Sequence, residues 1–320
     1  MADAHAKLRL GISACLMGQE VRYDAGHKRD PFLVETLGRW VEWVPVCPEV
    51  EIGLGVPRPT MRLEGKGEAK PRLVVHATQE DLTDRMTRWS QRRARDLGGE
   101  SLDGYVLKSG SPSCGMERVR VYGAKGPPRK EGVGVFARAL AERMPLLPTE
   151  EEGRLHDPGL RENFIERVFA HHRWRVLRSG RPRARDLVDF HARHKMTLLA
   201  HHPKGYRELG RLVARAGSGP LAPVLDAYGQ GFMQALRHRA TRRRHTNVLQ
   251  HLMGHLKHVL DTGDRRELTE VIERYRNGLL PLIVPVTLLF HHFRRHPVPW
   301  VNEQTYLDPY PAELMLRNHV

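Results

Sequence analysis

The sequence predicts a two-part protein, in which an α/β domain is followed by an all-helical domain, and three observations lead to this prediction. Strand-like and helix-like segments alternate through the first 150 residues, as in a Rossmann-like fold with a mostly parallel sheet. From residue 151 onward, apolar residues recur at helical spacing. Residues 1–150 carry 24 Lys and Arg against 20 Asp and Glu, whereas residues 151–320 carry 28 against 17. We therefore expect domains at 1–150 and 151–320, joined within a stretch punctuated by proline and glycine.

The elements of the first part follow from short apolar runs and from helical periodicity. Thr78, with Asp81 three residues later, predicts the start of a long helix that Gly98 and Gly99 end. The other segments alternate along the chain, which indicates strands covered by helices. The predicted strands are 8–13, 41–46, 72–75 and 104–108, and the predicted helices are 32–40, 79–97 and 133–144.

The second part is predicted to be helical throughout, with proline and glycine at the joins. One apolar run, 279–290, is too short to cross a bilayer and contains Pro281 and Pro285. The first residues lack the layout of a signal peptide, so we expect a cytoplasmic protein with no membrane partner. The predicted helices are 160–177, 184–201, 206–216, 220–236, 246–260 and 265–277.

Positive charge is concentrated in the second part. The chain of 320 residues has 52 Lys and Arg against 37 Asp and Glu, and residues 151–320 alone carry a net charge of +11. Such an excess favours a polyanionic partner, nucleic acid first, although a solvated basic face without a partner remains the alternative. The candidate RNA-binding side chains are Arg237, Arg239, Arg242, Arg243 and Arg244, with a second cluster at Arg173, Arg175, Arg181, Arg183 and Arg185.

The three cysteines of the chain lie in the first part, each after a predicted strand. Cys15, Cys47 and Cys114 therefore belong to loops at the carboxyl ends of strands, where open α/β sheets bind ligands. A small, odd number of cysteines argues against a disulfide framework and for a reducing compartment. Three converging thiols are one interpretation, and three unrelated buried cysteines are the other.

Three soft ligands are compatible with more than one metal. They can hold three irons of a four-iron cluster and leave the fourth without a protein ligand, or they can bind zinc. Glu49 follows Cys47 by two residues and is placed to move a proton, while Ser111 precedes Cys114 by three and can donate to a developing anion. A salt bridge at the rim and ordinary turn chemistry are the competing explanations for Glu49 and the serine loop.

Three sequence blocks resemble the thiouracil desulfurase family. They are GISACL with VRYDAGHK around Cys15, CPEVEIGLGVPRP around Cys47, and KSGSPSCG around Cys114. The blocks occur in order and cover most of residues 8–145, while residues 151–320 resemble the helical domain of unknown function often fused to that family. The fused form resembles bacterial enzymes that remove sulfur from 4-thiouridine in tRNA.

The resemblance implies an oxygen-sensitive [4Fe–4S] cluster held by Cys15, Cys47 and Cys114, with one iron not ligated by protein. It further implies that Glu49 and Ser111 are the catalytic pair of a non-redox, hydrolytic desulfidase. The expected substrate is tRNA that contains 4-thiouridine, converted to uridine with release of sulfide, or else free thiouracil bases. Asp24, His27 and Lys28 are weaker candidates for orienting the substrate.

Other function classes stay open at the level of the sequence. A non-enzymatic RNA-binding iron–sulfur protein, an enzyme for free thiouracil bases only and a zinc hydrolase each fit some of the features. Histidines at 251, 255 and 258, and at 191 and 194, recur at helical spacing, but no glutamate of an HExxH motif accompanies them. We expect most of these histidines to be core, surface or phosphate-facing residues rather than metal ligands.

Overall fold

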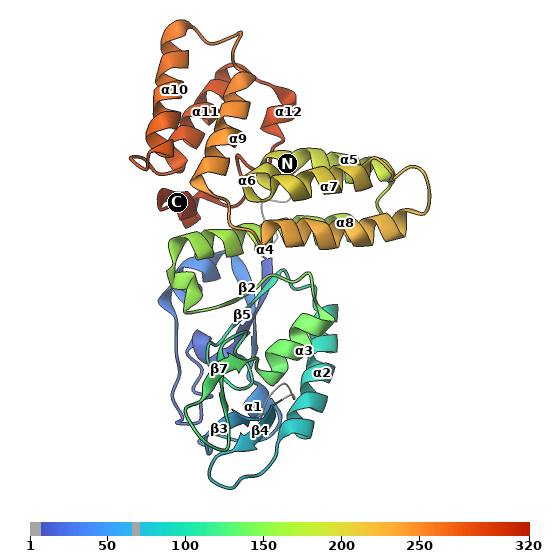
Figure 1. The fold of residues 1–320 in the computed structure, drawn as a ribbon, viewed down its shortest axis with the longest axis vertical. Coiled ribbons are helices and arrows are strands. Elements are labelled where there is room, and N and C mark those ends of the chain that lie inside the picture. The colour runs from blue at the N-terminus through green and yellow to red at the C-terminus, as the bar shows by residue number, and fades with distance from the viewer. Residues whose placement is uncertain (1–7, 66–70) are drawn as a thin grey trace. The chain divides into compact units, whose positions relative to one another are not determined.

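The fold is described from a computed structural model for residues 8–65 and 71–320. The chain forms two compact units that divide between His156 and Asp157 (Figure 1). This division lies within the predicted proline- and glycine-punctuated stretch but after residue 150. The strand Thr149–Glu151 and the short turn Arg154–His156 therefore belong to the first unit.

A parallel sheet forms the centre of the first unit, as the alternating pattern predicted. The strand order is β2-β1-β5-β8, and every neighbouring pair is parallel. The β1 strand is paired along both edges and is buried almost throughout. The strands of this sheet are β1 (Leu8–Ser13), β2 (Val41–Val46), β5 (Gly104–Leu107) and β8 (Thr149–Glu151).

Two helices cover one face of this sheet. Helices α2 (Thr83–Gly99) and α3 (Val135–Arg143) lie side by side in Figure 1. Leu97 of α2 and Phe136 of α3 pack with strand residues that include Tyr105 in one buried apolar cluster. The neighbouring short helical segments are η1 (Ala14–Met17), η2 (Phe32–Thr36), η3 (Leu37–Arg39), α1 (Pro48–Glu51) and η4 (Arg154–His156).

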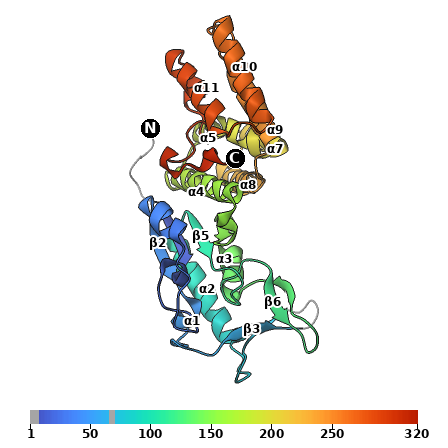
Figure 2. The same cartoon turned by 90° about the vertical axis from the view of Figure 1, so that its left-hand side faces the viewer.

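A second, mixed sheet in the first unit was not predicted as such. Its order is β4-β3-β6-β7, with β3 and β6 parallel and both outer pairs antiparallel. Figure 2 shows β3 and β6 next to each other, apart from the strands of the parallel sheet. Only one strand of this sheet, 72–75, was expected; among the others, Arg129–Gly132 has no apolar side chain. The strands are β3 (Met61–Glu64), β4 (Arg72–Val75), β6 (Val119–Tyr122) and β7 (Arg129–Gly132).

Two predicted helices of the first unit are corrected. The helix expected over 79–97 begins only at Thr83, because residues before it form a turn in which Gln79 has a positive φ of 59°. Asp81, not Thr78, accepts the amide of Thr83, at 2.9 Å. The segment 32–40 is helical but not an α-helix, since it forms a π-helical turn followed by a 3₁₀ turn.

The second unit is helical in its described residues, as predicted. The helix expected over 184–201 is divided at His194, whose Nδ1 lies 2.8 Å from the Phe190 carbonyl. The helix expected over 246–260 begins at Arg242 and ends at Gly254. The segments are α4 (Pro158–Ser179), α5 (Ala184–Arg193), α6 (Lys195–His201), α7 (Pro203–Val213), α8 (Leu221–Leu236), α9 (Arg242–Gly254), α10 (Thr262–Arg276), α11 (Ile283–Arg295), α12 (Pro299–Asn302), η5 (Ala312–Leu314) and η6 (Leu316–Asn318).

The core of the second unit joins α6, α9, α10 and α11. Leu252 of α9, Leu268 of α10 and Leu289 of α11 are fully buried in one apolar cluster. From the apolar run 279–290, Leu282, Val286 and Leu289 enter this core at the start and in the first half of α11. Helices α10 and α11 lie side by side (Figures 1 and 2). Among the described residues, no helix combines the length and the hydropathy that a membrane crossing requires.

Candidate active site at the carboxyl ends of the parallel strands

The three cysteines line one cavity of about 400 Å³ in the first unit. Cys15 follows β1 and Cys47 follows β2, while Cys114 lies in the loop between β5 and β6. Parallel strands place their carboxyl ends at one edge of a sheet, so residues far apart in sequence meet there. The cavity is lined also by polar and charged side chains, among them Arg22, Lys28, Glu49, Arg58, Lys108, Ser109 and Ser111.

The loop that carries Cys114 is fixed to the first turn of α3. The amides of Phe136 and Ala137 donate to the Ser113 carbonyl, at 2.9 and 3.2 Å. Gly134 lies so close to this loop that a Cβ atom there would stand 2.4 Å from the Ser113 carbonyl oxygen. Glycine at this position therefore permits a contact that holds the Cys114 loop in place.

Ser111 joins the backbone of this loop to Glu49. The Ser111 hydroxyl oxygen accepts the amides of Ser113 and Cys114, at 3.2 and 3.1 Å. The same hydroxyl donates to Oε1 of Glu49 at 3.5 Å, although the two residues are 62 positions apart. The structure thus brings together the carboxylate and the hydroxyl that the sequence singled out.

Glu49 lies on the short helix α1 and is only 8% exposed. Its Oε2 is 3.5 Å from the Cys47 thiol and 3.9 Å from Nη2 of Arg58. Arg58 also donates through Nη1 to the carbonyls of Val21 and Gly55, at 2.9 and 3.0 Å. Sequence reasoning assigned Arg58 no function, yet it orients the carboxylate and joins two loops of the cavity wall.

Lys108 and Glu152 form a second polar group at this cavity. Their ion pair measures 2.5 Å, and Glu152 also accepts the Ser109 hydroxyl and amide, at 2.8 and 2.7 Å. Burial raises the pKa of Glu152, but the hydrogen bond and charge of Lys108 outweigh it and lower that pKa. Sequence reasoning placed Glu152 in the helical part, because the expected boundary stood at residue 150.

The donor set fits an iron–sulfur cluster. Burial, followed by the charge of Glu49, raises the pKa of Cys15 to about 11 and that of Cys47 to about 12, and raises the pKa of Cys114 as well. These thiols hold their protons at neutral pH and must release them to bind metal. Among the described residues, no three His, Cys, Asp or Glu side chains converge on a single ion. Ligands of different irons in one cluster do not need to converge in that way.

The three weaker substrate-orienting candidates are placed differently by the structure. Lys28 lines the cavity. Asp24 pairs with Arg22 at 3.3 Å and accepts the Gly26 amide at 3.2 Å. Nδ1 of His27 accepts the Arg29 amide at 3.2 Å. Lys28 is therefore the one of the three that reaches the candidate site.

The candidate RNA-binding arginines of the second unit differ in their contacts. Arg244 donates to the His201 carbonyl at 2.5 Å, and Arg242 lies over the ring of Tyr275. Arg239 pairs with Asp157 at 3.8 Å, and Arg237 is exposed. Arg243 is exposed and forms no ion pair with any residue described here. Arg173, of the second arginine cluster, donates to the Pro309 carbonyl.

The histidines singled out by spacing have structural contacts. His191 lies 3.1 Å from the Tyr228 hydroxyl and stacks on Tyr206, and burial lowers its pKa to about 4. His251 and His255 pack against Trp300. Helix α9 ends at Gly254, so His255 and His258 are not on the helical face that their spacing predicted.

Fold and site together define an α/β protein with a thiol-lined cavity, joined to a helical unit. Residues 10–152 match the family described as 2-thiouracil desulfurase, and residues 195–311 match the family described as protein of unknown function DUF1722. The chain therefore belongs to the 2-thiouracil desulfurase family and carries a DUF1722 domain after it.

Two known proteins resemble parts of the chain. The uncharacterized protein YbgA of Escherichia coli strain K12 is 33% identical over 158 residues, which are 49% of this chain and 94% of YbgA. The solved structure of the [4Fe-4S]-dependent thiouracil desulfidase TudS is 30% identical. That match covers 47% of this chain and 95% of TudS, with a TM-score of 0.39.

Proposed function

We propose that the protein is a [4Fe–4S]-dependent, non-redox desulfidase that converts 4-thiouridine in tRNA to uridine. The thiocarbonyl carbon and one water molecule give a carbonyl group and hydrogen sulfide, so no electron donor or acceptor is needed. The observation that carries the proposal is the convergence of three thiols, Glu49 and Ser111 on one cavity. Membership of the 2-thiouracil desulfurase family supports the type of reaction.

Cys15, Cys47 and Cys114 would hold the cluster, because thiolates are the usual protein ligands of iron–sulfur centres. When bound, a cluster with one iron free of protein ligands supplies a soft Lewis acid suited to the sulfur of a thiocarbonyl. The cavity volume of about 400 Å³ and its mixed polar and apolar wall suit a pyrimidine ring.

Glu49 is the proposed proton carrier. Its carboxylate takes a proton from the attacking water and returns it to the ring nitrogen or to the departing sulfur, a role that carboxylates fill when they are positioned within reach. Ser111 donates to Oε1 and Arg58 approaches Oε2, so each oxygen of Glu49 has a fixed neighbour. This arrangement keeps the carboxylate in one orientation toward the cavity.

The helical unit is proposed to bind the tRNA. A free base needs no extended basic surface, whereas a polynucleotide releases counterions when Lys and Arg side chains neutralise its phosphates. Residues 151–320 carry a net charge of +11. Arg237, Arg239, Arg242 and Arg243 are exposed on or next to α9, which supports a role in phosphate contact.

The deciding experiment uses anaerobically prepared enzyme and tRNA that contains 4-thiouridine. After incubation, the tRNA is digested and its nucleosides are quantified together with the released sulfide. Uridine and sulfide formed in equal amounts support the proposal. Intact 4-thiouridine, together with efficient desulfuration of free 4-thiouracil, contradicts the tRNA substrate. That result favours the alternative suggested by the family description, an enzyme for free thiouracil bases.

A further inference from the structure

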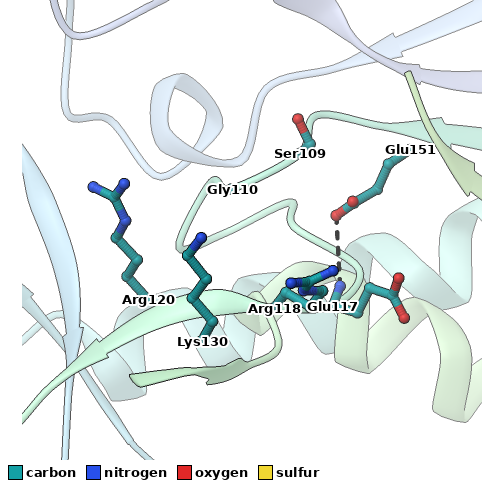
Figure 3. A pocket seen from close by; sticks show the side chains of 7 residues that line it. All are labelled: Ser109, Gly110, Glu117, Arg118, Arg120, Lys130 and Glu151. Carbon is teal, nitrogen blue, oxygen red and sulfur yellow. Dashed lines mark hydrogen bonds between the residues drawn. The ribbon is translucent and has the colours of Figure 1, made fainter. Parts of the chain in front are cut away.

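A second cavity of about 350 Å³ adjoins the thiol-lined cavity in the first unit. Ser109 and Gly110 belong to the walls of both cavities. Figure 3 shows Arg120 and Lys130 rising from the strands beneath the Ser109–Gly110 loop. The remaining lining residues are Glu117, Arg118 and Glu151, so three of the charged side chains are cationic.

Arg120 and Lys130 are directly opposite each other on antiparallel strands. Arg120 of β6 is in register with Lys130 of β7. Like charges in such a position destabilise a strand pair, because their side chains are close neighbours on one face. Both side chains are exposed, and neither forms an ion pair within the ranges 8–65 and 71–320. The strand pair thus keeps an unneutralised pair of cations on its cavity face.

Neither of the two carboxylates in the cavity wall forms an ion pair with Arg120 or Lys130 among the described residues. Glu117 pairs with Arg154 at 3.1 Å, and Oε1 of Glu151 accepts the Met116 amide at 2.8 Å. On the other face of β7 the charges are balanced, since Arg129 pairs with Glu131 at 3.1 Å. On this strand pair, the two cations without an ion pair therefore lie on the face that lines the cavity.

We propose that Arg120 and Lys130 bind a phosphate ester of the nucleotide whose base enters the thiol-lined cavity, an inference that rests on the proposed function. A phosphate between the two cations would remove their mutual repulsion, and guanidinium and ammonium groups are the usual phosphate ligands of proteins. The two cavities share a wall, so a base and its phosphate can occupy them at once. The loop from Ser111 through Cys114 continues directly into β6, which places both sites on one segment of chain.

The first test measures binding of a labelled single-stranded oligouridylate to the full-length protein over a range of salt concentrations. The double variant Arg120→Ala, Lys130→Ala should bind more weakly. The slope of log affinity against log salt should fall by about 0.7 for each lost phosphate contact. Arg129→Ala is the matched control, because this residue lies beside Lys130 on the same strand but faces the opposite side. Its affinity and slope should equal those of the wild type.

The second test compares turnover of three substrates: 4-thiouracil, 4-thiouridine 5′-monophosphate and thiolated tRNA. The double variant should process 4-thiouracil at the wild-type rate, while kcat/KM for a phosphate-bearing substrate should fall about tenfold per lost charge-assisted contact. A loss with both phosphate substrates identifies the phosphate of the reacting nucleotide. A loss with tRNA alone identifies a neighbouring backbone phosphate and overturns the assignment to the reacting nucleotide.

Lys130→Glu separates binding from folding. Opposing Arg120 with a carboxylate should give a melting temperature equal to or above that of the wild type, together with weaker oligouridylate binding. Unchanged binding, salt slope and turnover in the double variant and in Lys130→Glu would overturn the proposal. If tRNA keeps its sulfur with the wild-type enzyme while these variants still weaken oligouridylate binding, the tRNA substrate is wrong and the phosphate site stands.

Discussion

The hydroxyl of Ser111 donates to Oε1 of Glu49 across 3.5 Å, and the same hydroxyl oxygen accepts the amides of Ser113 and Cys114. The proposed proton carrier is therefore connected through one side chain to the loop of a proposed cluster ligand. A change at Ser111 would act on Glu49 as well as on the substrate, whereas a change at Glu49 leaves the Cys114 loop bonded as before.

Replacing Glu49 should abolish most activity without removing the cluster. We expect Glu49→Gln to lower kcat for 4-thiouracil and for thiolated tRNA by about 10²–10⁴, the scale of a lost general acid–base group. Iron and sulfide content should equal those of the wild type, because all three cysteines remain. Glu142→Gln, at an exposed position of α3, is the control. Retained activity in Glu49→Gln would assign the proton transfer to another group.

Arg58 should prove to be a positioning residue. Its guanidinium approaches Glu49 and bonds the Val21 and Gly55 carbonyls together, a geometry that one ammonium group cannot reproduce. We therefore expect Arg58→Lys to lower kcat by about tenfold, the scale of one charge-assisted hydrogen bond, and Arg58→Ala to lower it further, with KM for 4-thiouracil changing less. Equal activity of Arg58→Lys and the wild type would show that only the charge is needed.

Loss of any one cysteine should remove the metal centre. Protein purified without oxygen should contain close to four irons and four sulfides per chain. Cys15→Ala, Cys47→Ala and Cys114→Ala should each lose both, together with the visible absorption. A fragment that ends at His156 should retain the cluster, because the three thiols and Glu152 lie before that residue. Stoichiometric zinc in active protein would contradict this prediction.

The residues that line the candidate site were predicted from the sequence more completely than the fold around them. Cys15, Cys47, Glu49 and Cys114 follow strands or lie within short motifs, so local pattern alone was informative. The strand β7, Arg-Lys-Glu-Gly, has no apolar residue and exists only because it pairs with β6. Glu152 reaches Lys108 from 44 positions away. Such long-range pairings have no signal in the local sequence, which is why the second sheet and the partner of Lys108 were not predicted.

A buried ion pair should make the stability of the helical unit fall at both low and high pH. His201 and Glu166 are almost fully buried. Nε2 of His201 lies 2.7 Å from Oε2 of Glu166. Burial raises the pKa of Glu166, but the charge and hydrogen bond of His201 outweigh it and bring that pKa to about 2, from an ordinary 4.5. Burial lowers the pKa of His201, but Glu166 outweighs it and raises that pKa above the ordinary 6.5.

Glu166 and His201 therefore stabilise the folded state over different pH ranges. The contribution of Glu166 is complete above pH 4.5 and is lost as the pH falls toward about 2, whereas that of His201 is complete below pH 6.5 and is lost as the pH rises through its raised pKa. Between these limits, Glu166→Gln should lower the free energy of unfolding by about 3–5 kcal/mol. Chemical denaturation across pH measures this, with the exposed His258→Gln as control. A constant difference between variant and wild type would contradict the coupling.

The arginines of the basic run 237–244 differ in whether they can be replaced without disturbing the fold of the helical unit, and this decides which of them can test tRNA binding. Arg244 holds the carbonyl of His201, so its removal would disturb the fold of the unit. Arg242 and Arg243 are exposed on the first turn of α9, and their guanidinium groups can reach phosphates. We expect Arg242→Ala, Arg243→Ala to weaken tRNA binding and to lower the salt slope by about 0.9 per lost contact with duplex RNA, by analogy with duplex DNA.

Turnover of free 4-thiouracil should stay at the wild-type rate in this double variant, because the cavity with Glu49 and Ser111 is unchanged. Arg242→Lys, Arg243→Lys should recover most of the binding, since phosphate contacts of this kind depend chiefly on charge. Equal tRNA affinity and salt slope in the alanine variant and the wild type would contradict a role of α9 in binding. The exposed arginines of α9 would then be solvated residues without a partner. Any tRNA contacts would have to come from other arginines of the helical unit.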